Sequence, residues 1–316
     1  MASGSVKVIV AALIGNGLIA VTKFAAAAFT GSAAMLSEGI HSLVDTGNQG
    51  LLLYGMGRSK LPPDRQFPFG HGKEIYFWSF VVAILIFAVG AGVSIWEGVK
   101  HMLHPAPIEN VHVNYIVLGL SIIFESVAWY MAFREFNRTR GRRGMVEAVR
   151  QGKDPSLFVV LFEDSAAMAG LIIAMFGIWL ASTTGWYWLD GLASVLIGLI
   201  LAGTAIWLAI ETKSLLIGEA ADQQVVEGIR QMAADMPEVN GVNEVLTLHM
   251  GPDFILVNMS VDFHNTLAAE VLEGCIAGMD ATIKQRFPRV KRIFVEAEAR
   301  RIQPRQAAEA VPSSPS

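Results

Sequence analysis

Six long apolar runs dominate the first two thirds of the chain. Each has about the 20 residues that a helix needs to cross the hydrocarbon core of a bilayer. We interpret the first as a retained helix rather than a cleaved signal sequence, because Asn16 and Lys23 interrupt it and no small-residue cleavage site ends a short apolar core. The predicted transmembrane helices are Val8–Phe29, Ala33–Met56, Ile75–Trp96, Val113–Phe133, Leu157–Ala181 and Trp188–Ile210.

The pattern changes after Lys213, where the apolar runs become shorter and alternate with charge, as in a soluble domain that buries one face. The predicted elements are a helix at Asp222–Asp235, strands at Gly241–His249 and Phe254–Phe263, a helix at Ala268–Phe287 and a strand at Val290–Ala297. The predicted fold class is an α-helical membrane protein with six transmembrane helices and a C-terminal αββαβ domain of ferredoxin or metallochaperone type. Its predicted parts are residues 1–214, 215–302 and a disordered tail at 303–316, which is too poor in apolar surface to fold.

Basic residues concentrate in two loops, whereas the loops after the first, third and fifth runs hold at most Lys100. Cytoplasmic loops retain Lys and Arg, so both termini and the C-terminal domain are predicted to face the cytoplasm. No transit peptide is evident, so we expect a multi-pass protein of the cell inner membrane, with an organellar membrane as the open alternative. The basic residues are Arg58, Lys60, Arg65 and Lys73 in one loop and Arg138, Arg140, Arg142, Arg143, Arg150 and Lys153 in the other.

Composition agrees with a lipid environment and narrows the function. Only 16% of the residues are charged and 53% are hydrophobic, whereas soluble domains carry about 25% charged residues. The net charge of −4 gives no sign of a nucleic-acid partner. The lone Cys275 excludes an intrachain disulfide framework and any zinc module built from several cysteines.

The second apolar run carries a polar stripe made of Glu38, His41, Asp45 and Asn48, which are three or four residues apart and therefore share one helical face. A charged group at the bilayer centre costs at least about 2.5–3.5 kcal/mol, so such groups face a protein interior or a water-filled cavity. His41 and Asp45, one turn apart, make a two-point clamp for a borderline cation such as zinc. The alternative is that the stripe only hydrogen-bonds neighbouring helices together.

The fifth run contains two adjacent acids, Glu163 and Asp164. Adjacent residues point about 100° apart on a helix, so at most one of them faces a site fully. We take Asp164 as the ligand and Glu163 as a residue that supports the ligands from behind, a proton carrier or an ion-pair partner of Lys23. Glu125 of the fourth run is a possible metal or proton-relay residue, with a structural hydrogen-bonding role as the open alternative. Asp190 follows an aromatic belt and is interpreted as a helix cap at the interface.

Two segments carry a resemblance to a known family. His41-Ser42-Leu43-Val44-Asp45, followed by Phe67-Pro68-Phe69-Gly70-His71-Gly72-Lys73 before the third run, resembles the cation diffusion facilitator family. Asp164, the Leu189-Asp190-Gly191 opening of the sixth run and the αββαβ domain continue the likeness. The runs Ser37–Gln49 and Leu161–Ala167 are most similar to the branch that contains the animal mitochondrial zinc transporter.

The resemblance implies a homodimeric metal/proton antiporter whose transport site lies between the second and fifth helices. It assigns His41, Asp45 and Asp164 as metal ligands, and it expects a further ligand one turn before Asp164, where this chain has Val160. Water, Glu163 or Glu38 are the open replacements, and Asn48 is a further candidate for the metal or proton path.

The family also has two cytoplasmic metal sites, for which the match is weaker. In the loop before the third helix, Asp64 and His71 match, but Phe67 occupies the middle ligand position, so a weak site is expected. In the C-terminal domain, the last strand lacks the family's His-x-Asp. We therefore interpret that domain as a metal-free dimerisation module, with His249 and His264 as surface strand residues.

These observations predict secondary active efflux of a divalent transition metal from the cytoplasm in exchange for protons. A histidine with carboxylates favours Zn²⁺, with Mn²⁺, Co²⁺, Fe²⁺ and Cd²⁺ as further candidates, and no prosthetic group is expected. A membrane metal sensor or scaffold without transport remains an alternative. A metalloenzyme is disfavoured, because the chain has no His-Glu-x-x-His and no general-base motif.

Overall fold

The computed structural model describes residues 2–108, 110–140, 144, 148–149 and 154–299. The predicted tail at 303–316 lies outside this part, as do Arg142, Arg143, Arg150 and Lys153 of the predicted basic loop. The chain divides into two compact units, Met1–Ile217 and Gly218–Ser316.

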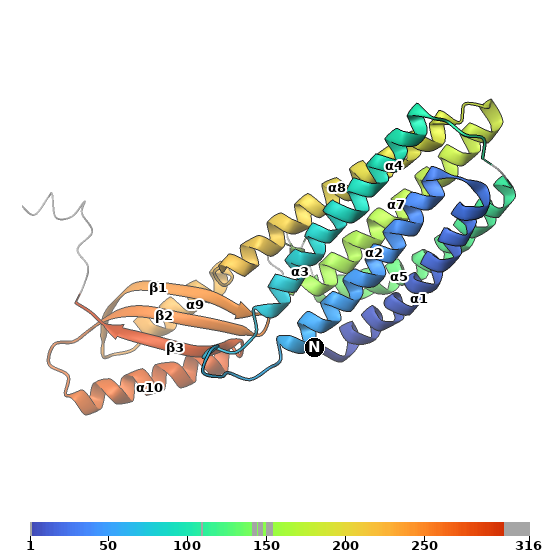
Figure 1. The fold of residues 1–316 in the computed structure, drawn as a ribbon. Helices are drawn as coiled ribbons and strands as arrows, with labels where there is room; N and C mark the ends of the chain where they lie inside the picture. The colour runs from blue at the N-terminus through green and yellow to red at the C-terminus, as the bar shows by residue number, and fades with distance from the viewer. Residues whose placement is uncertain (1, 109, 141–143, 145–147, 150–153, 300–316) are drawn as a thin grey trace, which may run out of the picture. The chain divides into compact units, whose positions relative to one another are not determined.

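The first unit is a bundle of long helices that lie side by side (Figure 1). The third predicted span continues further than expected, because α3, η1 and α4 form one unbroken helical path through Glu74–Leu103. The elements are α1 (Ala2–Thr30), α2 (Ala33–Arg58), α3 (Glu74–Leu85), the π-helix η1 (Ile86–Ala91), α4 (Gly92–Leu103), α5 (Val111–Arg140), α7 (Pro155–Thr184) and α8 (Trp188–Ile217).

Five segments of this bundle are long and apolar enough to cross a membrane. The α2 helix is not among them although it has 26 residues. Its buried face holds charged and amide side chains, so its mean hydropathy falls below that of the other spans. The spans are Ala12–Thr30, Glu74–Leu103, Val111–Arg138, Pro155–Thr184 and Trp188–Ile217.

Local sequence signals fix the ends of the two helices that carry the polar residues. Ser32 caps α2 by accepting a hydrogen bond from the Met35 N–H at 3.1 Å. Asp154 caps α7 in the same way, and Pro155 occupies the first turn, where its missing N–H leaves no bond unmade. Gly185 ends α7 with φ +71°, a left-handed conformation that glycine adopts without strain.

Small residues allow α4 and α8 to approach closely. A Cβ on Gly98 would lie 2.7 Å from the Gly191 carbonyl oxygen, so no larger residue fits at this crossing. Such contacts between small residues are a main source of helix association in membranes. The π-helical turn at Ile86–Ala91 lies between α3 and α4, the helix that makes this contact.

The second unit is a small α/β domain with α9 (Gln223–Ala234), β1 (Val239–Gly251), β2 (Phe254–Phe263), α10 (Ala269–Arg286) and β3 (Val290–Ala297). The sheet order is β1-β2-β3, with β1 and β2 antiparallel and β2 and β3 parallel through the α10 crossover. Its core is formed by Ile229, Val257, Met279 and Ile283, all fully buried.

Candidate functional site

The predicted polar stripe of α2 faces the interior of the bundle. Its side chains are spaced at three or four residues, so they line one face of the helix. Glu38, His41 and Asn48 are fully buried and Asp45 is 1% exposed. Ser37, Ser42 and Gln49 lie buried beside them.

His41 and Asp45 form the pair that the sequence predicted. The Nδ1 atom of His41 lies 3.3 Å from Oδ1 of Asp45. Among the described residues, neither ring nitrogen of His41 has a hydrogen-bond partner, and the same holds for Oδ1 of Asp45. Buried polar atoms are normally paired, so these atoms are available to a ligand that the protein alone does not supply.

The α7 helix contributes its two acids to the same region. Glu163 and Asp164 are 1% and 2% exposed, and the carboxyl of Glu163 lies within hydrogen-bond reach of Asp45. The Asn48 amide donates to Oε1 of Glu163 at 2.6 Å. Asp164 lies within electrostatic range of Asp45, and its Oδ2 has no partner in the described part of the chain. Three carboxyls and an imidazole therefore share one buried region.

Val160 occupies the position where the family resemblance expects another ligand. Its side chain is 1% exposed and belongs to the apolar core of the bundle. It supplies no donor, whereas Glu163 is already in contact with Asp45. Of the three open replacements, Glu163 is therefore the one that contacts Asp45.

Glu38 has a different environment from Asp45. Lys23 of α1 donates to Oε2 of Glu38 at 3.0 Å and to the Ser42 hydroxyl at 2.8 Å, so the predicted alternative pairing of Lys23 with Glu163 is wrong. Oε1 of Glu38 points toward Gly170 of α7, where a Cβ would clash with it. Glu125 on α5 is 1% exposed, and neither of its oxygens has a partner among the described residues.

These groups do not form a closed coordination shell. Within the part of the chain that the structure describes, no three His, Cys, Asp or Glu side chains are placed so that they could hold a metal ion. His41, Asp45, Glu163 and Asp164 thus line an ionisable centre whose side chains would have to move to enclose an ion.

Asp190 caps a helix, but not its own. Its Oδ2 accepts a hydrogen bond from the Ala33 N–H at 2.7 Å, and its Oδ1 accepts one from the Ser32 hydroxyl at 2.9 Å. The Nδ1 atom of His101 on α4 lies 3.4 Å from Oδ2 of Asp190. The interpretation of Asp190 as a cap at the opening of α8 is thus corrected: it joins the beginning of α2 to α4 and α8. This link depends on tertiary contacts that one helix's sequence does not reveal.

The loop residues Asp64 and His71 contact each other directly. His71 Nε2 lies 3.0 Å from Asp64 Oδ2, and its Nδ1 lies 3.3 Å from Glu74 Oε1. The backbone N–H of Phe67 and the His71 ring lower the pKa of Asp64. The Phe67 ring packs against His71 with 4.5 Å between centroids. Both nitrogens of His71 thus face carboxylates within the protein, and the pair holds the loop together.

The two histidines of the second unit differ from each other. His264 is exposed, as predicted. His249 is 2% exposed, so its interpretation as a surface residue is wrong. Its backbone N–H donates to the Glu219 carbonyl at 3.0 Å, so the segment before α9 lies beside this end of β1.

Together, the membrane-capable helices and the ionisable centre between α2 and α7 define a multi-pass membrane protein with a polar site inside an apolar bundle. Residues 9–217 match the model of the cation efflux transmembrane domain. The chain belongs to the cation efflux family, which confirms the resemblance found in its motifs and places it among transporters rather than enzymes.

Three relatives illustrate the range of similarity. The human mitochondrial proton-coupled zinc antiporter SLC30A9 is 36% identical over 262 residues, which are 82% of this chain and 46% of the relative. Metal tolerance protein C4 of Arabidopsis thaliana is 29% identical over 268 residues, covering 84% of this chain and 59% of the relative. The cation-efflux pump FieF of Shewanella oneidensis is 24% identical over 259 residues, covering 81% and 82%. The chain spans about half the length of the zinc antiporter.

Proposed function

We propose that this chain exports a divalent transition metal ion, with Zn²⁺ as the favoured substrate, in exchange for protons. The observation that carries the proposal is the buried His41–Asp45 pair on α2, beside the acids of α7. Both ring nitrogens of His41 and Oδ1 of Asp45 have no hydrogen-bond partner among the described residues. One imidazole with carboxylates suits Zn²⁺, Co²⁺, Fe²⁺ or Mn²⁺ better than Mg²⁺ or Ca²⁺. The similarity to a proton-coupled zinc antiporter supports the same substrate.

In this proposal His41, Asp45 and Asp164 bind the ion directly, and Glu163 takes the place left by Val160. Metal ligands must lose their protons before they bind, so each ion that enters displaces protons from these groups. Protonation from the other side of the membrane then favours release. Glu38, Glu125 and Asn48 border the pathway and carry protons or orient ligands.

The proposed architecture has six spans, with α2 counted as a span despite its polar face. The loop at residues 59–73 is rich in Lys and Arg, and cytoplasmic loops retain such residues. This loop is therefore assigned to the cytoplasm, together with both termini and the C-terminal domain. The membrane is the cell inner membrane. The protein is a homodimer, and its C-terminal domain (residues 215–302) joins the two copies without metal.

The test is reconstitution of the full chain in proteoliposomes with a metal-sensitive dye inside. Uptake of Zn²⁺, Mn²⁺, Co²⁺, Fe²⁺ and Cd²⁺ is followed with and without an imposed pH gradient. The proposal expects uptake of Zn²⁺ that rises with the gradient and disappears in Asp45→Ala and Asp164→Ala. Asn114→Ala serves as the control, because Asn114 is also buried but bonds to Thr30 outside the centre.

Each part of the proposal has its own contrary outcome. Uptake that ignores the pH gradient contradicts proton exchange while leaving metal transport intact. Flux that survives both substitutions means that the polar stripe is structural. Metal binding without any flux in the native chain supports the sensor function instead.

A further inference from the structure

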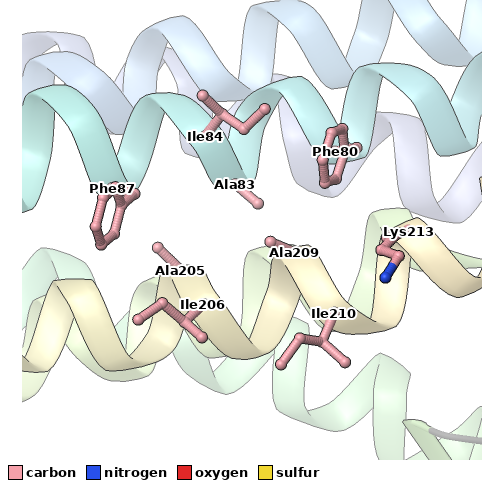
Figure 2. Close-up of a pocket in the computed structure, with 9 residues that line it drawn as sticks. All are labelled: Phe80, Ala83, Ile84, Phe87, Ala205, Ile206, Ala209, Ile210 and Lys213. Atoms are coloured by element: carbon pink, nitrogen blue, oxygen red, sulfur yellow. The ribbon is translucent and has the colours of Figure 1, made fainter.

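A groove of about 300 Å³ runs along the outer side of the bundle between the α3–η1 path and α8 (Figure 2). Phe80 and Phe87 stand along one wall, and Ala205 and Ala209 of α8 lie across from them. Among the described residues that line it, Lys213 is the one with a charged side chain. The groove is therefore apolar along its length and cationic at one end.

Packing of small residues explains why the groove exists. At Gly98 and Gly191 the two helices are in backbone contact and leave no space between them. Toward the other end, the facing residues are Ala83, Ala205 and Ala209, whose methyl groups are too short to fill the gap. Because protein interiors are close-packed, a trough of this kind on a membrane span is filled by some other molecule.

The position of Lys213 along α8 indicates which molecule fits. The 30 residues of α8 make a helix about 45 Å long, whereas the hydrocarbon core of a bilayer is about 30 Å thick. Each end of α8 thus extends about 7 Å into a headgroup layer. Lys213 lies four residues before Ile217, the last residue of α8, which is about 6 Å. Its ammonium group is at headgroup depth, while Ala205 lies among acyl chains.

A second lysine reaches the same end of α8. The ammonium of Lys73 donates to the Leu216 carbonyl oxygen at 3.4 Å. Lys213 itself forms no ion pair with another described residue. Among the described residues of the first unit, this end of the groove therefore carries a lysine charge that no ion pair neutralises.

We propose that the groove binds an acidic phospholipid, with one acyl chain between Phe87 and Ala205 and the headgroup phosphate on Lys213. A basic pocket between transmembrane helices on the cytoplasmic side is the expected form of such a site, and the placement of Lys213 on that side rests on the membrane orientation that belongs to the proposed function. The competing occupant is an apolar helix of a second copy of the chain. It fits less well, because it would cover Lys213 without bringing a counter-charge, and an unpaired buried charge is costly.

Lipid binding is measured on the purified full chain in detergent, by native mass spectrometry during titration with phosphatidylglycerol or phosphatidylcholine. The proposal expects tighter binding of phosphatidylglycerol. Lys213→Gln weakens it about five-fold, the contribution of one lysine near an anionic surface, and leaves phosphatidylcholine unchanged. Lys60→Gln is the matched control, since Lys60 is an exposed lysine of the neighbouring loop that does not line the groove.

A second variant separates the acyl chain from the charge. Ala209→Leu narrows the groove and weakens the binding of both lipids, whereas Lys213→Arg retains the preference for phosphatidylglycerol. Equal binding of the two lipids by the native chain, or unchanged binding by both Lys213→Gln and Ala209→Leu, overturns the proposal. None of these readouts depends on metal transport.

Cross-linking tests the competing occupant. Ile206→Cys in a Cys275→Ser background places a single thiol beside the groove, because Ile206 is 52% exposed and lines it. A lipid-filled groove gives no disulfide between copies in native membranes. Efficient disulfide formation means that a second copy covers the groove and overturns the lipid proposal.

Discussion

Two buried aspartates in the same bundle have opposite environments. Asp190 is fully buried, and both its oxygens accept hydrogen bonds from the beginning of α2. Asp45 is equally buried, but it faces Glu163 and leaves Oδ1 without a hydrogen-bond partner among the described residues. A charged group inside a membrane protein thus serves either to join helices, when it is paired, or to receive a ligand, when it is not.

Lys23 and Glu38 give the largest expected effect, because both members of this ion pair are fully buried. Lys23→Met leaves the Glu38 carboxylate buried without its cation, which costs about 3–5 kcal/mol. Reversible unfolding in mixed micelles measures the loss. Lys23→Met with Glu38→Gln removes both charges and recovers most of the stability. If the double variant is as unstable as the single one, the pair is not what stabilises this contact.

Asp45→Asn and Asp164→Asn test the acids that are proposed to receive a ligand. Each removes one proposed ligand, and metal flux falls at least about 100-fold, more than the loss caused by a support residue. Thermal stability stays level or rises, because each change removes a desolvated carboxylate from a group of like charges. Flux and melting temperature are measured on the same preparation. A clear fall in melting temperature would show that these acids also hold the helices together.

Asp190→Ala is expected to have the opposite effect, a loss of stability with metal flux retained by the protein that folds. The Ser32 hydroxyl and the first N–H groups of α2 lose their acceptor, so the free energy of unfolding falls by about 2 kcal/mol. Hydrogen exchange at the first turn of α2 increases, and flux falls only as far as folded protein is lost. Ser32→Ala is a milder control that removes one of these bonds. Flux that disappears while stability is unchanged would move Asp190 into the transport pathway.

Asp64 gives the smallest effect, because the pair that it forms with His71 lies in an exposed loop. Its pKa is lowered in the folded state below the ordinary value of 3.8. The interaction therefore stabilises the loop fully above about pH 4 and is lost as the pH falls through the lowered pKa. Limited proteolysis of the loop from pH 3 to 7 detects this change. Asp64→Asn removes the pH dependence of cleavage, and a dependence that persists would point to another acid.

Much of the bundle and its site follow from the sequence, because membrane helices have a strong apolar signal and the polar stripe repeats with the helical period. Glu38, His41, Asp45 and Asn48 lie on one buried face of α2 as that period predicts. Glu163 and Asp164 both reach the same region, although adjacent residues were expected to diverge. The close approach of α7 to α2 allows both carboxyls to lie near Asp45.

Other features depend on contacts between distant segments. Lys23 pairs with Glu38, and Asp190 caps α2. Each of these residues has several buried polar groups as possible partners, and no local sequence pattern shows which of them it contacts. The burial of His249 is due to the segment before α9 lying along β1. The π-helical turn at Ile86–Ala91 lies in a uniformly apolar run without Pro, so the sequence offers no marker for it.

That π-helical turn limits which insertions and deletions the chain tolerates. Each residue of an α-helix adds about 100° of rotation and 1.5 Å of rise. Deleting one residue from the turn would convert it to a regular α-turn and leave α4 facing as it does now, because a π-turn takes up about one residue more than an α-turn. Deleting one residue from the regular part of α4 before Gly98 would instead rotate the rest of α4 against α3 by roughly a quarter of a turn. Gly98 would then no longer face Gly191, and the two backbones would have to separate. The length of the regular helices on either side of this turn is therefore under stronger constraint than the length of the turn itself.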